Sequence, residues 1–213
     1  KNEKLDLVNT RLAILIALLH DIGRFEQVKR YHSYEDSIID HAKLGIQILF
    51  DQKMIRNFIQ DEHYDKIIYD AISNHSLYQI DPFVSKDSLL QCKIIRDSDK
   101  LDNYRVKLTE KISTLFDIEI NEFIDEKVGN KVLQAVMDHQ LILKEIRVNH
   151  MDRWISYLAF LYDLNFKSSY LLIQENNYIN LTIDRFHYKD QDTIERIRKE
   201  MINYMEEKIN ENY

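Results

Sequence analysis

The sequence has little proline, glycine or cysteine, and each shortage excludes a class of structure. Its 213 residues include one Pro and three Gly, which leaves little material for the tight turns of β-hairpins. A single cysteine, Cys92, excludes an internal disulfide framework. No apolar run reaches the length of a membrane span or a signal peptide. We therefore predict an all-helical protein that is cytoplasmic and has no membrane partner.

The charge balance argues against a second class of partner. The formal net charge is −7, and no basic stretch is long enough to follow a phosphate backbone. Duplex nucleic acid is therefore not an expected partner. Hydrophobic residues make up 45% of the chain, enough to build a core without outside help.

Apolar residues recur at helical spacing along most of the chain, with polar connectors between the runs. Helices are predicted up to about residue 21 and over about 37–50, 64–75, 86–103, 131–145 and 152–164, followed by shorter helices around 168–186. A terminal helix is predicted to place Ile194, Ile197, Met201, Met205 and Ile209 on one stripe. The acidic stretch 116–130 is either a loop or a frayed helix. Aromatic residues gather in the second half, which is typical of helix packing or of a homodimer interface.

The segment "IALLHDIGR" ends an apolar helical run with His20 and Asp21, just before Gly23. Gly23 is a plausible helix stop, with Arg24 in the loop beyond it. A histidine suits the negative end of a helix dipole, whereas a carboxylate flanked by apolar residues there is disfavoured by the dipole and by desolvation. The sequence therefore requires a cation beside Asp21, either Arg24 or a metal ion.

Two more histidines are predicted to point toward the core. His41 shares a helical face with Leu44, Ile48 and Leu49, and Gly45 on that face suggests a close backbone approach. His75 follows Ile68, Ala71 and Ile72 on a stripe of the next predicted helix. Taken singly, each is more typical of a hydrogen-bonded core histidine than of a metal ligand.

A fourth inward group lies in "IIRDSDKLD". Ile94, Ile95, Ser98 and Leu101 define the predicted buried stripe, and Asp99 borders it. Asp97 and Asp102 are expected on a solvated acidic face with Arg96 and Lys100 as partners. Buried ionisable groups persist only when they are paired or coordinated. Imidazole and carboxylate ligands together suit Mn, Fe, Zn, Co or Ni, and also Mg where carboxylate and water dominate.

These motifs carry a resemblance to a known family. "LLHDIGRFEQ", "DHAKLG", "AISNHS" and "IIRDSDKLD" resemble, in order and spacing, the HD-domain superfamily of metal-dependent phosphohydrolases. The resemblance implies an all-α, compact multi-helix bundle, with residues 1–105 as the metal-binding core and 106–213 as a helical extension packed on it.

The resemblance also implies a ligand set and an activity. His20 and Asp21 correspond to the family's pair, Asp99 to its closing ligand, and His41 and His75 to the additional histidines that hold a second ion. The family's first His has no counterpart in residues 1–19. We expect it upstream of Lys1, and the alternative is a degenerate member of the family. The implied activity is hydrolysis of a phosphate ester of a nucleotide or related small metabolite.

Two cations are candidate catalytic residues. Arg24 and Lys100 are each placed to neutralise charge that develops on a phosphate. The alternative for Arg24 is a helix-end cation that only offsets Asp21 or the dipole.

Two other functional classes stay open at the level of sequence. A non-catalytic regulatory module of the same fold would bind metal or nucleotide and contact a partner through its aromatic second half. A purely structural helical bundle would leave the inward His and Asp residues without a role.

Overall fold

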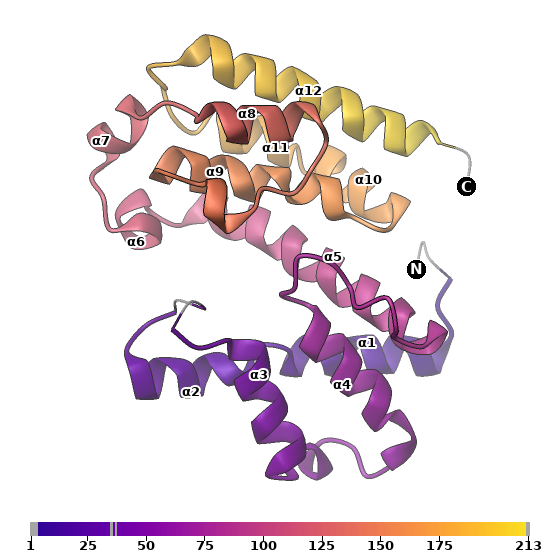
Figure 1. Cartoon of the computed structure of the whole chain (residues 1–213). Coiled ribbons are helices and arrows are strands. Elements are labelled where there is room, and N and C mark those ends of the chain that lie inside the picture. Colours follow the sequence, from indigo (N-terminus) through magenta and orange to yellow (C-terminus); the bar gives the residue numbers. More distant parts are fainter. Residues whose placement is uncertain (1–3, 35, 37, 212–213) are drawn as a thin grey trace. The chain divides into compact units, whose positions relative to one another are not determined.

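The computed structural model describes residues 4–34, 36 and 38–211, and these residues contain helices and connectors but no strand (Figure 1). The all-helical prediction is confirmed. Among the described residues, no helix is both long enough and apolar enough to cross a membrane.

The chain divides into two compact units, Lys1–Asp99 and Lys100–Tyr213. The sequence placed this boundary a few residues later, between 105 and 106. Helix α5 (Lys86–Thr109) contains the boundary, so its first part belongs to the first unit and its last part to the second. The expected packing of the extension on the core stays a prediction.

The first unit is built from short helices around an aliphatic core. After α1 (Leu7–Leu19) and α2 (Ile22–Tyr31) come α3 (His41–Ile46), a π-helical turn over Gln47–Asp51, 3₁₀ turns at Met54–Asn57 and Glu62–Tyr64, and α4 (Asp65–Asn74). Helix α3 contacts both α2 and α4, and α4 contacts α1. The buried core includes Leu12, Ile16, Leu19, Leu49, Ile68, Ile72 and Ile95. The predicted inward stripe of α4 is confirmed, because Ile68, Ala71, Ile72 and His75 are all buried.

Two predicted helix boundaries in this unit are wrong. The first helix ends at Leu19 and a second begins at Ile22, so Gly23 lies inside the first turn of α2 and stops nothing. Helix α3 begins at His41, four residues later than predicted. The carboxylate of Asp40 accepts hydrogen bonds from the backbone N–H groups of Ala42 and Lys43, which fixes that N-terminus.

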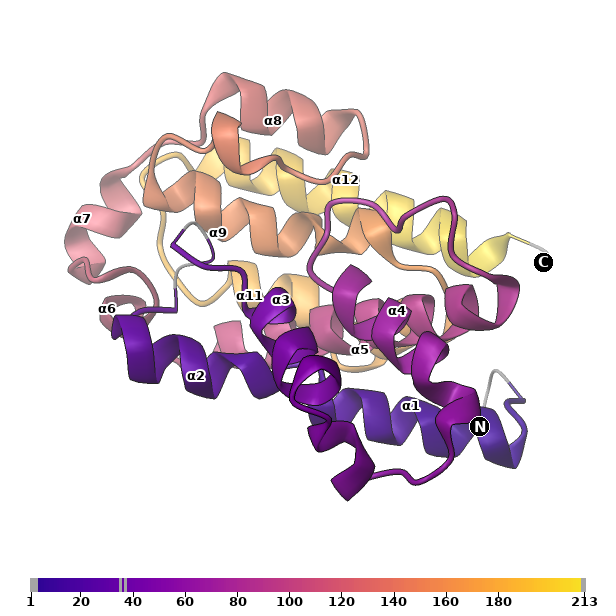
Figure 2. The same ribbon diagram turned by 60° about the horizontal axis from the view of Figure 1, so that its bottom comes forward.

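Helix α3 crosses the beginning of α2 (Figure 2), and the contacts of Gly23 with the backbone of α3 place it at this crossing. A Cβ atom at Gly23 would lie 2.0 Å from the carbonyl oxygen of His41 and 2.6 Å from the backbone nitrogen of Gly45. A Cβ atom at Gly45 would meet nothing nearer than 3.5 Å. The close backbone approach predicted at Gly45 is therefore present, but Gly23 is the residue that permits it.

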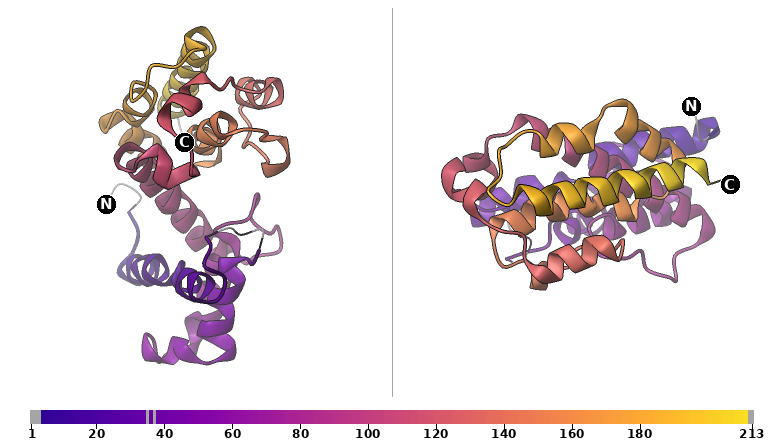
Figure 3. Two further views of the ribbon diagram at one scale, coloured as in Figure 1. Left: turned by 90° about the vertical axis from the view of Figure 1, so that its left-hand side faces the viewer. Right: turned by 90° about the horizontal axis from the view of Figure 1, so that it is seen from above.

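The second unit packs its helices around an aromatic core. It contains α6 (Ile112–Phe116), α7 (Ile120–Asp125), α8 (Asn130–Met137), α9 (His150–Leu158), a 3₁₀ turn over Ala159–Asp163, α10 (Lys167–Glu175), α11 (Tyr178–Ile183) and α12 (Gln191–Asn210). Within this unit α12 packs against α8, α10 and α11 (Figure 3). The rings of Phe116, Phe123, Trp154, Phe186 and Tyr188 lie against one another.

The sequence predicted the terminal helix of this unit better than its first half. Ile194, Ile197, Met201 and Met205 of α12 are buried, and Ile209 is partly buried, as predicted. The acidic stretch 116–130 contains one short helix, α7. The helix predicted over 131–145 ends at Met137, where His139 adopts a positive φ of 54°.

Asp152 is a fully buried carboxylate that joins two segments of the second unit. Its oxygens accept hydrogen bonds from the backbone N–H groups of Gly129 (2.7 Å) and Val148 (2.9 Å). In Asp152→Asn, the amide keeps one acceptor and leaves one N–H unpaired. We expect the free energy of unfolding to fall by about 1–2 kcal/mol in urea denaturation.

The control is Asp125→Asn, which changes an exposed carboxylate 3.4 Å from the ammonium of Lys189. Its unfolding free energy is expected to change by no more than about 0.5 kcal/mol. Equal losses in the two variants would contradict the structural role of Asp152.

Candidate metal centre

His20 and Asp21 occupy the junction between two helices. His20 is the C-cap of α1, directly after Leu19, and its backbone N–H donates to the carbonyl oxygen of Ile16. Asp21 is the N-cap of α2, where the helix dipole favours a negative charge. The predicted dipole penalty on Asp21 is therefore wrong, because α2 begins directly after it. The predicted burial is wrong as well, since 49% of its side chain is exposed.

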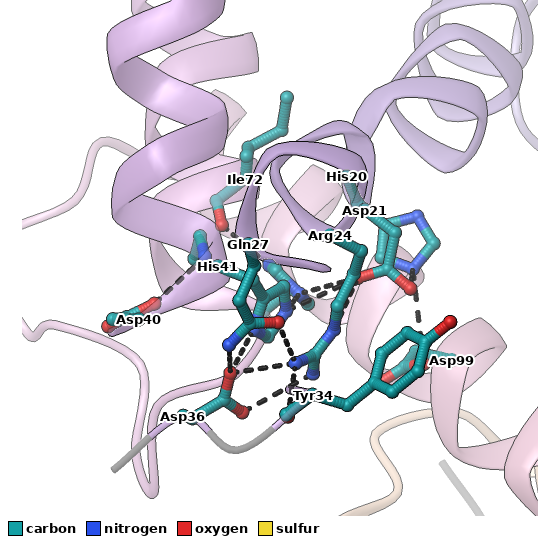
Figure 4. Close-up of polar contacts among 12 residues, drawn as sticks. His20, Asp21, Arg24, Gln27, Tyr34, Asp36, Asp40, His41, Ile72 and Asp99 are labelled. Carbon is teal, nitrogen blue, oxygen red and sulfur yellow. Dashed lines mark hydrogen bonds and ion pairs between the residues drawn. The ribbon is translucent and has the colours of Figure 1, made fainter. Parts of the chain in front are cut away.

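Three further side chains converge on this junction within the first unit. Figure 4 shows His41, from the beginning of α3, and Asp99, from the middle of α5. The third, His75, follows the end of α4 and contacts Asp21. His41 Nε2 lies 3.2 Å from Asp21 Oδ1 and 2.9 Å from His75 Nε2. His20 Nε2 lies 3.6 Å from Asp21 Oδ2 and 3.9 Å from Asp99 Oδ1. One ligand atom each from His20, Asp21 and His75 fits within 4.8 Å of the others.

Each of the three imidazoles is held in the same way, through Nδ1. His20 Nδ1 is 2.8 Å from the carbonyl oxygen of Ala17, and His75 Nδ1 is 2.6 Å from that of Ile72. His41 Nδ1 is 2.7 Å from Asp36 Oδ1. Carbonyl and carboxylate oxygens only accept, so each Nδ1 carries the hydrogen. In the neutral rings, all three Nε2 lone pairs then face the centre of the cluster.

The positions of these Nε2 lone pairs indicate whether the cluster suits a bound cation. Two neutral imidazoles that both carry the hydrogen on Nδ1 cannot hydrogen bond through Nε2 atoms 2.9 Å apart, and their lone pairs repel. A positive charge between or beside the two atoms is required to offset this repulsion. A divalent ion satisfies this requirement and also suits the two carboxylates.

A proton on His41 is the other way to meet the requirement. Burial lowers the pKa of His41, but its hydrogen bonds with Asp21 and Asp36 raise the pKa above the ordinary value. Burial lowers the pKa of His75 to about 4, so this ring is neutral. The residues therefore fit a metal, and in the metal-free chain a proton on His41 can take its place.

The cluster has a closed side and an open side. The side chains of His41 and His75 are 3% and 2% exposed, whereas those of Asp21 and Asp99 are 49% and 32% exposed. Burial raises the pKa of Asp21, but the His41 hydrogen bond and the charges of His20, His41 and Arg24 lower it to about 2. An ionised carboxylate therefore faces solvent at the open side.

Arg24 is not in a loop but in α2. Its guanidinium forms an ion pair with Asp36, with NH1 2.8 Å from Oδ1 and NH2 3.3 Å from Oδ2. Its Nε lies 3.7 Å from Asp21 Oδ1. Contact with a substrate phosphate stays a prediction for Arg24.

Lys100 is placed in the second unit rather than with the five clustered residues. Its ammonium lies 2.8 Å from the Asp163 carboxylate and 5.7 Å from the Phe160 ring centroid. A catalytic role for Lys100 also stays a prediction.

The predicted faces of α5 are partly wrong. Ser98 is exposed, whereas Arg96 and Asp97 are buried. Arg96 NH1 donates to the carbonyl oxygens of Asn74 and Leu77, at the end of α4, which explains why a cation is buried there. Asp99 is partly exposed, in agreement with its predicted place at the border of the buried stripe of α5. Its Oδ1 contacts His20 Nε2 in the cluster.

Sequence reasoning missed Asp36 and Gln27, which complete the surroundings of His41. Asp36 lies in the polar stretch "KRYHSYEDS", and Gln27 lies in a helix that was not predicted. The available signals were the spacing of five residues between Asp36 and His41 and a glutamine one turn after Arg24.

Comparison with known families identifies the first part of the chain. The sequence model of the HD domain matches residues 2–104, and this match is consistent with the HD-domain superfamily. Comparison with curated proteins and with solved structures gave no match.

Proposed function

We propose that this chain is a metal-dependent phosphohydrolase, in which His20, Asp21, His41, His75 and Asp99 hold one or two divalent ions. The observation that carries the proposal is the convergence of three Nε2 atoms and two carboxylates, with every Nδ1 already engaged by an acceptor. Mn, Fe, Zn, Co, Ni and Mg are compatible with these ligands.

The residues on the closed side and those on the open side of the site would have different roles. A bound divalent ion supplies activated water at neutral pH and offsets the negative charge of a phosphate. His41 and His75 exclude bulk water from the closed side and fix the directions of their Nε2 atoms. Asp21 and Asp99 present ionised or polar oxygens at the open side, where a phosphate ester can approach.

The substrate class is a small phosphorylated metabolite, with nucleotides as the first candidates from the family resemblance. The test is a screen of phosphorylated metabolites in the presence of Mn²⁺, Co²⁺, Zn²⁺, Ni²⁺ and Mg²⁺, each after removal of metal with a chelator. Hydrolysis that depends on added metal supports the proposal. Metal binding without hydrolysis of any substrate would instead favour the non-catalytic regulatory module.

Metal binding is also expected to stabilise the first unit. An ion that binds only the folded chain adds about 2.7 kcal/mol of stability when its concentration is 100 times its dissociation constant. The thermal midpoint of the metal-free chain should therefore rise on addition of Mn²⁺ or Co²⁺.

His63→Gln serves as the control for this experiment, because His63 is an exposed histidine of the same unit that contacts Tyr64. It should keep the full thermal shift, whereas His75→Gln should lose it. A midpoint that does not respond to any of the metals would contradict the proposed ligand set.

A further inference from the structure

His41 differs from the other two histidines in how its ring is held. His20 and His75 each end a helix, and each Nδ1 uses the carbonyl oxygen three residues earlier in that helix, that of Ala17 or Ile72. His41 is the first residue of α3, so no helical turn precedes it. A side chain has to supply the acceptor, and Asp36 does so.

Asp36 is itself fixed by two side chains that lie one turn apart on α2. Its Oδ1 accepts from Arg24 NH1 at 2.8 Å and from Gln27 Nε2 at 3.3 Å, and its Oδ2 accepts from Arg24 NH2 at 3.3 Å. These hydrogen bonds are charge-assisted, and the two from Arg24 form a bidentate pair that favours one relative orientation of the guanidinium and carboxylate planes. Asp36 therefore has little freedom to turn away from His41.

Gln27 hydrogen bonds with both Arg24 and Asp36, and its own amide orientation is fixed by the backbone. It is fully buried, its Oε1 accepts from Arg24 NH1 at 2.9 Å, and its Nε2 donates to the carbonyl oxygen of Ile39 at 2.8 Å. Because that carbonyl oxygen only accepts, the amide nitrogen has to face it and Asp36. Arg24 NH1 also donates to the carbonyl oxygen of Tyr34 at 3.0 Å. The group thus ties α2 to the backbone on both sides of Asp36.

We propose that Asp36 is a positioning residue that fixes the Nδ1–H tautomer and the ring orientation of His41, and that Arg24 and Gln27 hold its carboxylate in place. The inference deepens the proposed function, because His41 Nε2 is one of the atoms assigned to the metal. It also gives Arg24 a role through Asp36, without contact to a substrate. Hydrogen-bonded partners of ligating histidines commonly contribute 10–100-fold to metal affinity, as an order of magnitude.

The first test reads the tautomer of His41 in the metal-free chain by ¹⁵N NMR of the imidazole rings, in alkaline solution where the rings are neutral. The signal of His41 is assigned by its absence in His41→Gln. In the native chain we expect the Nδ1–H form. In Asp36→Asn, the neutral amide no longer accepts from both nitrogens of Arg24 and is a weaker acceptor than the carboxylate. The hydrogen bond that favours the Nδ1–H form is then weaker, and we expect His41 to shift toward the Nε2–H form.

Asp40→Asn is the matched control, since it makes the same change one residue before His41. Asp40 caps α3 through its side-chain oxygen, and asparagine caps a helix equally well. The His41 tautomer should stay unchanged in this variant. An unchanged tautomer in Asp36→Asn would overturn the inference, as would an equal shift in both variants.

The second test measures binding of Mn²⁺ and Co²⁺ by calorimetry. We expect Asp36→Asn to bind about 10–100-fold more weakly than the native chain, and Asp40→Asn to bind equally well. Arg24→Gln should weaken binding in the same direction. The double variant should bind no more weakly than Asp36→Asn alone, because both residues act through one carboxylate.

The outcomes separate this inference from the proposed function. If the native chain binds no metal, the proposed function fails, while the NMR result still decides whether Asp36 fixes His41. If the native chain binds metal and Asp36→Asn binds it equally well, the positioning role is overturned and the proposed function stands. If Asp36→Asn does not fold, Arg24→Gln gives the same NMR and calorimetric tests with the carboxylate retained.

Discussion

Asp21→Ala is expected to lose metal binding and metal-dependent hydrolysis together, while the chain still folds. Asp21 lies within 4 Å of all three Nε2 atoms, at 3.6, 3.2 and 3.9 Å from those of His20, His41 and His75. Removing it takes a shared oxygen ligand from the centre of the cluster. We expect the metal affinity, measured by calorimetry with Mn²⁺ and Co²⁺, to fall by more than about 100-fold. This exceeds the loss of about 10–100-fold that is typical when a hydrogen-bond partner of a ligand is removed.

The effect of this substitution on stability has a definite sign. Asp21 opens α2, so its charge lies at the favourable end of that dipole, and its removal should cost no more than about 1 kcal/mol of unfolding free energy. A gain in stability would have been expected if α1 had continued past Asp21. Chemical denaturation of the metal-free chain measures this difference.

Asp87→Ala is the matched control for Asp21→Ala. Asp87 is an exposed aspartate in the first turn of α5, so the charge change and the place at a helix N-terminus are the same. Metal binding and hydrolysis should be unchanged in this variant. Full metal content in Asp21→Ala would show that the His-Asp pair is a structural ion bridge, and the proposed hydrolase would lose its physical basis.

Local patterns in the sequence were sufficient to predict that His20, Asp21, His41, His75 and Asp99 point inward. They did not reveal that α1 ends and α2 begins at His20 and Asp21. Leu12, Ile16, Leu19 and Ile22 follow one another at helical spacing, so the apolar pattern runs through the turn at His20 and Asp21 without interruption. The dipole argument for Asp21 failed for this reason. His41 and His75 were found because each shares a face with buried neighbours, and that depends only on helical geometry.

The surroundings of these residues depend on tertiary contacts, which a single sequence does not reveal. Asp36 lies in a polar stretch without periodicity, and its partner Arg24 is twelve residues away. The burial of Arg96 likewise follows from the carbonyl oxygens at the end of α4, about twenty residues earlier in the chain. In both cases the residue type agrees with several environments, and only the packing of helices selects one of them.

Gly23→Ala is expected to destabilise the first unit and to displace the proposed metal ligand His41 in the same step. The new Cβ atom would lie 2.0 Å from the carbonyl oxygen of His41 and 2.6 Å from the backbone nitrogen of Gly45, and neither backbone group can turn away as a side chain would. Helix α3 therefore has to move. We expect the unfolding free energy to fall by about 3 kcal/mol, the upper part of the range for overpacking, when measured by urea denaturation of the metal-free chain.

Gly45→Ala makes the same chemical change on the other side of the crossing, where a Cβ atom would be in ordinary contact with Ile22 at 3.5 Å. Alanine favours the helix over glycine by up to about 1 kcal/mol, so this variant should be as stable as the native chain or more stable. Metal affinity should fall in Gly23→Ala, because the beginning of α3 carries His41, and should persist in Gly45→Ala. Equal stability of the two variants would contradict the crossing geometry, since the two sites differ only in the space available for one methyl group.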